Sequence, residues 1–196
     1  MDADEAFLRL QAGNARFVGG ESIHPHEGVD RRRQVAAGVR PIATLLACSD
    51  SQAPPEIVFD QGLGDLFVIR VAGNVISADT LGSIQYAAVY LGTLLFVVLG
   101  HEGCGVVRAA IEERARQLHQ PGQIETLMRL ILPAIQSVPA GSDLETQLHL
   151  AIEANVRWAV NQITAMPLAR KAVKAQRVRI VGAVHELESG RVRFLE

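Results

Sequence analysis

The stretch Leu94-Leu-Phe-Val-Val-Leu-Gly-His-Glu-Gly-Cys-Gly105 decides how this chain is interpreted. Its first six residues are the longest apolar run in the sequence, and a run this short and apolar predicts a buried β-strand. Two metal-binding residue types, His101 and Cys104, follow that run directly. Because ligands bind beyond the carboxyl ends of the strands in an open α/β sheet, we expect a functional site here.

Further strands alternate with helical segments on both sides of this stretch. Apolar runs at 42–47, 66–69 and 178–185 are predicted strands, and 192–195 forms a closing hairpin with the last of them. Helices are predicted at 3–18, 30–38, from 56 to near 62, 79–91 with Asp79 as N-cap, 105–118, 123–137, 143–164 and 167–174. The alternation predicts an α/β protein with a mostly parallel β-sheet and flanking helices.

The size and charge of the chain limit the classes of partner. The 196 residues fit one domain, 1–196, and a formal charge of −2 gives no reason to expect nucleic acid or an anionic membrane as partner. A transmembrane helix needs about 20 apolar residues, far more than the longest run supplies. The N-terminus, Met-Asp-Ala-Asp-Glu, is acidic and lacks the apolar segment of a signal peptide. We therefore expect a cytoplasmic protein.

The two cysteines of the chain, Cys48 and Cys104, are candidate metal ligands together with His101. Cys48 comes directly after the predicted strand 42–47, so all three residues are expected at one edge of the sheet. Two sulfurs and an imidazole suit zinc, and three protein ligands leave a fourth position open, as in catalytic zinc sites. The alternative is two buried cysteines that act as small apolar residues. Asp50 can reach the same ion, or it caps a turn.

Several motifs, taken in order, resemble the signature of the β-class carbonic anhydrases. They are Cys48-Ser-Asp-Ser51, Phe59-Asp-Gln-Gly-Leu-Gly-Asp-Leu-Phe67, Arg70-Val-Ala-Gly-Asn74, Gly82-Ser-Ile-Gln-Tyr86 and Gly100-His-Glu-Gly-Cys-Gly105. The resemblance covers almost the whole chain and implies one Zn²⁺ on Cys48, His101 and Cys104. It also implies an antiparallel edge strand, an N-terminal helical arm over about residues 1–38, and a homodimer or higher homo-oligomer with active sites at the interface.

The resemblance further implies a substrate pocket, and two positions in and near it depart from the family pattern. Phe67 and Tyr86 are expected to line the pocket, and the glycine at Gly105 lets the backbone crowd the metal. Gln52 stands where the family usually has an arginine that pairs with the aspartate, and Val39 stands where it usually has a glutamine. Leu45 replaces the tryptophan of the subgroup with a non-catalytic bicarbonate site, so that regulatory site is not expected.

These departures bear on the expected reaction, the reversible hydration of carbon dioxide to bicarbonate. Asp50 and Gln52 are the candidate catalytic residues, and Asp50 is also a candidate fourth zinc ligand. An uncharged amide binds a carboxylate more weakly than a guanidinium does, so Asp50 should lean towards the metal and slow the reaction. The alternatives are hydrolysis of carbonyl sulfide or carbon disulfide, which the apolar Val39 mildly favours, and an inactive zinc-binding homologue.

Overall fold

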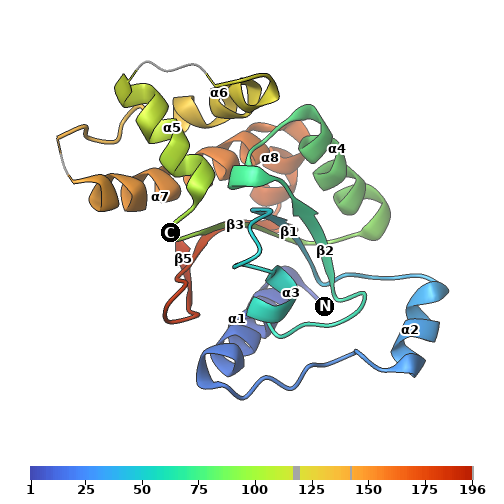
Figure 1. Cartoon of the computed structure of the whole chain (residues 1–196). Coiled ribbons are helices and arrows are strands. Elements are labelled where there is room, and N and C mark those ends of the chain that lie inside the picture. Colours follow the sequence, from blue (N-terminus) through green and yellow to red (C-terminus); the bar gives the residue numbers. More distant parts are fainter. Residues whose placement is uncertain (117–119, 142, 196) are drawn as a thin grey trace.

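A five-stranded sheet forms the centre of the protein in the computed structural model, which describes residues 1–116, 120–141 and 143–195 (Figure 1). The strands are β1 (Ala43–Ala47), β2 (Leu66–Arg70), β3 (Leu95–His101), β4 (Arg179–His185) and β5 (Val192–Leu195). Their order is β2-β1-β3-β4-β5. Every neighbouring pair is parallel except β4 and β5, which are antiparallel. The predicted parallel sheet with an antiparallel edge strand is confirmed.

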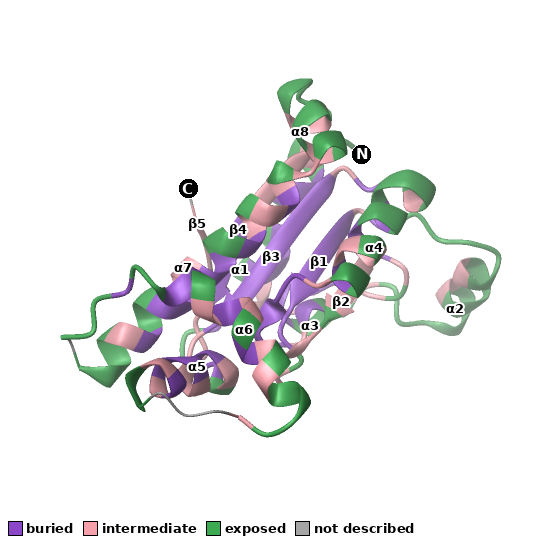
Figure 2. Ribbon diagram, turned by 90° about the horizontal axis from the view of Figure 1, so that it is seen from above, coloured by how far each residue is buried: buried purple, intermediate pink, exposed green. Residues whose placement is uncertain are grey.

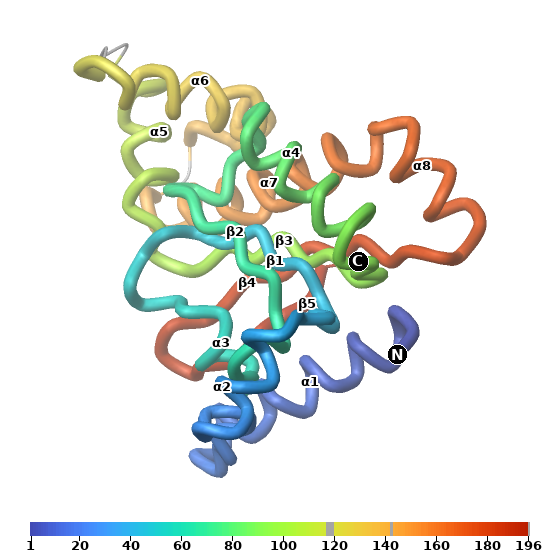
Figure 3. Tube along the Cα trace, turned by 90° about the vertical axis from the view of Figure 1, so that its right-hand side faces the viewer, coloured from blue at the N-terminus to red at the C-terminus, as the bar shows by residue number. Residues whose placement is uncertain are grey.

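Helices cover both faces of this sheet (Figures 1 and 3). One face carries α1 (Ala3–Gly19) and α3 (Pro55–Val58), and the other carries α4 (Ala78–Tyr86), α5 (Gly105–Arg116), α6 (Gln123–Ile135), α7 (Leu144–Ala165) and α8 (Pro167–Lys174). The segment expected to form an N-terminal arm contains two helices. The first, α1, packs on the sheet, and the second, α2 (Val29–Ala36), buries none of its residues. No described helix is long and apolar enough to cross a membrane.

The two central strands are buried on both faces, which explains their continuous apolar sequences. All residues of β1 and β3 are buried (Figure 2). Because side chains alternate along a strand, Leu45 and Leu99 enter the core on the α1 side, while Leu46 and Val98 enter the core beneath α5, α6 and α7. The parallel strands β1 and β3 run in register, so their carboxyl ends meet at one edge of the sheet.

The helix predicted at 79–91 differs from the prediction at both ends. Ser77, not Asp79, is its N-cap, because the Ser77 backbone is extended and its hydroxyl accepts the Thr80 N–H at 3.3 Å. The α-helix ends at Tyr86 and continues as a π-helical turn, η2 (Ala87–Leu91), that Gly92 closes with a left-handed backbone.

The helix predicted from residue 56 to near 62 is shorter in the structure. It ends at Val58 because Asp60 has a left-handed φ of 46°, which a helix cannot contain. The Asp60 carboxylate accepts hydrogen bonds from the N–H groups of Ile23 and His24 and forms an ion pair with Arg16 at 2.6 Å. These bonds hold the segment that follows α1 against the loop that follows α3. Residues 117–118 of the helix predicted at 105–118 lie outside the described residues.

Gly13 in α1 is a position where packing overrides helix propensity. Alanine normally stabilises a helix interior by about 1 kcal/mol relative to glycine. A Cβ on Gly13, however, would lie 1.9 Å from the Phe59 carbonyl oxygen, a backbone atom that cannot move aside easily. We expect Gly13→Ala to lower the free energy of unfolding by roughly 1–3 kcal/mol in urea denaturation.

Gly19 in the same helix is the matched control for this substitution. A Cβ there would meet no atom closer than 3.8 Å. We therefore expect Gly19→Ala to leave the free energy of unfolding unchanged or slightly higher. Equal stability of the two variants would show that α1 does not pack as described.

Candidate metal centre

Three buried side chains converge where β1 and β3 end. The Sγ atoms of Cys48 and Cys104 and a ring nitrogen of His101 all lie within 4.8 Å of one another. Within the described ranges this is the one such cluster of histidine, cysteine and acidic side chains. The structure thus brings together the three residues that the sequence predicted as zinc ligands.

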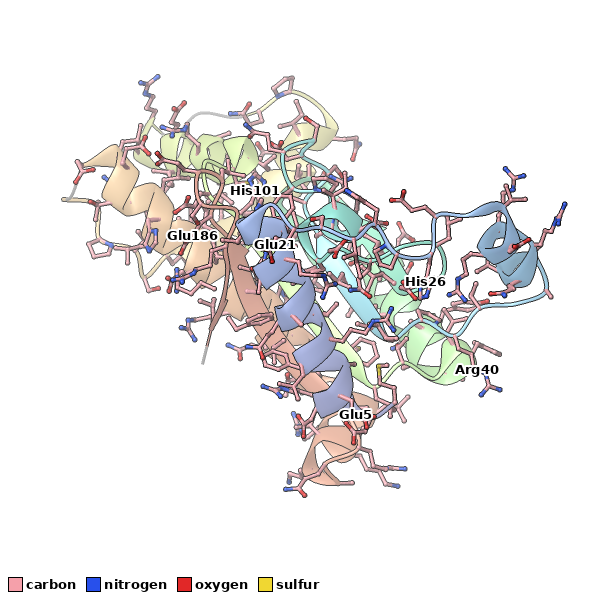
Figure 4. All side chains as sticks on the ribbon, turned by 90° about the horizontal axis from the view of Figure 1, so that it is seen from below. Glu5, Glu21, His26, Arg40, His101 and Glu186 are labelled. Carbon is pink, nitrogen blue, oxygen red and sulfur yellow. The ribbon has the colours of Figure 1, made fainter. Side chains whose placement is uncertain are left out.

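Local structure explains how residues far apart in the sequence meet. Cys48 follows β1, whose last residue, Ala47, pairs with Leu99 of β3, and His101 is the final residue of β3. A turn at Gly103, with a φ of 66°, then places Cys104 directly before α5. Figure 4, seen from the α1 side, shows His101 towards the end of the sheet where α1 leads to Glu21.

The His101 imidazole is prepared to bind a metal. Its Nδ1 lies 2.8 Å from the carbonyl oxygen of Glu102, to which it donates a hydrogen bond, and this fixes the tautomer. Its Nε2 is buried and has no hydrogen-bond partner among the described residues. A buried lone pair without a partner is costly, and a metal ion would satisfy it. The orphaned Nε2 and the two sulfurs therefore fit Zn²⁺.

The two cysteine sulfurs shift each other's pKa in opposite directions. A hydrogen bond from the Cys104 thiol lowers the pKa of Cys48 to about 4, and the same bond, with burial, raises the pKa of Cys104. Burial lowers the pKa of His101, but the Cys48 sulfur, the Glu102 carbonyl and the Asp50 charge together raise it by more, so the net shift is upwards. Because zinc binds thiolates, metal binding should release these protons.

Backbone N–H groups surround both sulfur atoms. Gly73 donates to Cys48 Sγ at 3.3 Å, and the Asp50 N–H also lowers the pKa of Cys48. The N–H groups of Val106 and Val107 in the first turn of α5 act in the same way on Cys104. Hydrogen bonds to a thiolate withdraw charge from it, which leaves a bound metal more electrophilic.

The loop that carries Asp50 and Gln52 lies beside the three ligands. The Asp50 carboxylate accepts the Gln52 backbone N–H at 2.9 Å and does not belong to the group of ligand atoms within 4.8 Å of one another. Arg70 of β2 donates from Nε to the Cys48 carbonyl oxygen at 3.0 Å and from Nη2 to the Asp50 carbonyl oxygen. Arg70 therefore clamps the backbone of this loop, a role that sequence analysis did not identify.

The residues expected to line the pocket fall into separate places within one chain. Gly105 begins α5, next to Cys104. Phe67 and Tyr86 lie together, with ring centroids 6.1 Å apart. Val39 lies before the amino end of β1, whereas Cys48 follows its carboxyl end, and Val39 lines a cavity of about 450 Å³ there. One chain therefore does not bring Val39 to the metal ligands.

Comparison with known proteins places these features in a family. The family model described as carbonic anhydrase matches residues 43–192. Carbonic anhydrase 2 of Mycobacterium tuberculosis is 36% identical over an alignment of 195 positions, and the match covers 95% of this chain and 89% of that protein. The carbonic anhydrase of Mycolicibacterium smegmatis is 37% identical over 189 residues, and the match covers 96% of this chain and 91% of that protein.

A solved structure shares the fold at lower sequence identity. One of the tetrameric β-carbonic anhydrases of Sordaria macrospora superposes with a TM-score of 0.77 and 22% identity, and the match covers 97% of both chains. With its matched sequence motifs, its parallel sheet and its Cys-His-Cys cluster, this chain belongs to the carbonic anhydrase family, in the β class.

Proposed function

We propose that this protein is a zinc-dependent carbonic anhydrase, a lyase that interconverts carbon dioxide and bicarbonate. The observation that carries the proposal is the convergence of two sulfurs and a ring nitrogen of His101, all buried and within 4.8 Å of one another, in a histidine whose Nε2 has no hydrogen-bond partner among the described residues. Two sulfurs and one imidazole are a zinc donor set that leaves room for a fourth ligand. Family membership supports carbon dioxide as the substrate.

Each nearby residue has a proposed part in this reaction. Zinc held by Cys48, His101 and Cys104 would supply a Lewis acid that activates water for attack on carbon dioxide. Asp50 would accept a hydrogen bond from the reacting water, and Gln52 would hold Asp50 through its backbone N–H. Asp50 has no charged partner at position 52. We therefore propose that its carboxylate also serves as the fourth zinc ligand in part of the molecules, which would slow turnover.

Stopped-flow hydration of carbon dioxide by the purified, zinc-loaded protein tests this function. We expect turnover well above the uncatalysed rate, together with slower or no consumption of carbonyl sulfide and carbon disulfide. Consumption of either sulfur compound without carbon dioxide hydration would assign the protein to the hydrolase alternative. Full zinc occupancy without turnover of any of the three would contradict an enzymatic role.

We further propose that the protein is at least a homodimer. Val39 lies far from the metal ligands of its own chain, so a second chain is needed if it is to line the pocket. An aromatic group formed by the half-buried Phe67 and the exposed Tyr86 and Tyr90 offers a contact surface. The rings of Tyr86 and Tyr90 stack with centroids 5.2 Å apart, and Tyr90 is 76% exposed. The tetrameric assembly of the Sordaria relatives supports oligomer formation.

Sedimentation velocity at micromolar concentration checks the assembly. We expect a species of at least twice the 21.2 kDa chain mass. Tyr90→Asp should shift the population towards monomer, because it places a charge in the aromatic group. Ile124→Asp on α6, also at an exposed apolar residue (47% exposed), is the matched control and should leave the dimer intact. A monodisperse wild-type monomer would contradict the proposal.

A further inference from the structure

Asn155 is a buried polar residue in the apolar face of α7. It is 2% exposed and lies between Ala151, Ile152 and Val156, which are buried in the core on the same side of the sheet as the two cysteines. A buried amide without hydrogen bonds destabilises the fold by about 1–3 kcal/mol, and an apolar residue would fill the space without that cost. An asparagine here therefore calls for a partner that needs its amide group.

The partner is the backbone of Gly73, 82 residues away in the sequence. Asn155 Nδ2 donates to the Gly73 carbonyl oxygen at 2.8 Å. Gly73 lies in the short turn η1 (Ala72–Asn74) with a left-handed φ of 72°, and a Cβ on it would lie 2.9 Å from Ile131 Cδ1. The hydrogen bond from Asn155 thus holds Gly73 in a left-handed conformation that few other residues could adopt.

Gly73 in turn contacts the proposed metal ligand. Its N–H donates to Cys48 Sγ at 3.3 Å, in the buried interior. The same residue is therefore fixed on one side by α7 and bonded to the sulfur on the other. Small errors in its position would change both the length and the angle of the bond to Cys48.

We propose that Asn155 is a positioning residue of the metal centre, which holds Gly73 so that its N–H donates to the Cys48 sulfur. The inference rests on the proposed zinc site. It adds to that site a residue of α7, a helix that contains none of the sequence motifs shared with the β-class carbonic anhydrases. Asn155 is not one of the three proposed ligands, and its proposed action is through Gly73. Loss of outer-shell partners of this kind typically weakens metal binding by about 10–100-fold.

The test substitutes Asn155 and observes the metal–sulfur bond directly. Asn155→Leu keeps the side-chain size and removes the donor. We expect its zinc dissociation constant, measured by chelator competition, to rise at least about tenfold. In the Co²⁺-loaded protein, the thiolate-to-cobalt absorption band should move to lower energy, because Cys48 loses part of its hydrogen bonding. Asn155→Ala, which also removes the donor but adds neither bulk nor charge, should act in the same direction and replaces the leucine variant if that fails to fold.

A buried residue elsewhere on α7 is the control for general destabilisation. Ile163 is 2% exposed and no described hydrogen bond joins it to η1, so Ile163→Ala should lower stability but leave the cobalt band and the zinc affinity unchanged. An unchanged band and affinity in Asn155→Leu, or equal changes in Ile163→Ala, would overturn the inference while leaving the zinc site standing. Wild-type protein that takes up neither zinc nor cobalt would overturn the proposed function and this inference together.

Discussion

Replacing any one of Cys48, His101 and Cys104 by alanine should abolish stoichiometric zinc binding and carbon dioxide hydration together. Each substitution leaves two protein ligands where a catalytic zinc site has three. Because outer-shell substitutions alone weaken metal sites by about 10–100-fold, loss of a direct ligand should weaken zinc binding by more than about 100-fold. Elemental analysis of the purified variants and stopped-flow hydration measure the two effects.

The control for this series is His149→Ala, a histidine substitution on the exposed side of α7. His149 is about half exposed, and its Nε2 lies 3.4 Å from the Glu153 carboxylate, so its contact is with a neighbouring residue of α7 and not with the metal ligands. Its substitution should preserve one zinc per chain and the wild-type hydration rate. A ligand variant that retains both full zinc and full activity would refute the assignment of that residue.

Gln52→Arg should raise the rate of carbon dioxide hydration several-fold. A guanidinium within about 4 Å of the Asp50 carboxylate would attract it by up to roughly 4 kcal/mol at an effective dielectric constant of 20. Gln52 is exposed, so solvent screening and lost side-chain entropy reduce this greatly. Even about 1.4 kcal/mol of preference for the state with Asp50 off the metal changes the ratio of the two states tenfold.

The comparison variants separate charge from shape at position 52. Gln52→Met removes the amide without adding charge and should give no gain in rate, while Gln52→Lys adds charge without the planar fork and should give a smaller gain. Adding Val39→Gln should raise the rate further if that side chain reaches the pocket from a second chain, and the two gains need not add. A fast wild type with no gain in Gln52→Arg would show that another group compensates for the missing arginine. The first candidates would be Arg70, which already clamps the backbone of this loop, and a residue of a second chain.

The sheet and the three ligands could be predicted because both follow from local patterns. The apolar run 94–99 specifies a strand buried on both faces, and parallel strands end at the same edge of a sheet. Cys48 and His101 each come at or just after such an end, so their convergence required no knowledge of the loops. Asp50 could be predicted near the metal ligands because it follows Cys48 by two residues at the same strand end.

The features that escaped prediction depend on side chains bonding to distant backbone. The bond from Asn155 to Gly73 spans 82 residues, and a buried asparagine in a helix carries no signal of its partner. Arg70 likewise donates to two backbone carbonyl groups. Because every residue has such a group, the sequence does not indicate which ones Arg70 will bind. The cap of α4 was misplaced by two residues because Ser77 and Asp79 are both good N-caps, and only the backbone angles distinguish them.

Titration of zinc into the metal-free wild-type protein, with carbon dioxide hydration measured at each addition, tests the central claim most directly. The rate should rise in proportion to bound zinc and reach its plateau at one zinc per chain, because Cys48, His101 and Cys104 form one site. A rate that does not depend on zinc, or a protein that binds one zinc per chain and remains without hydration activity, would contradict the account.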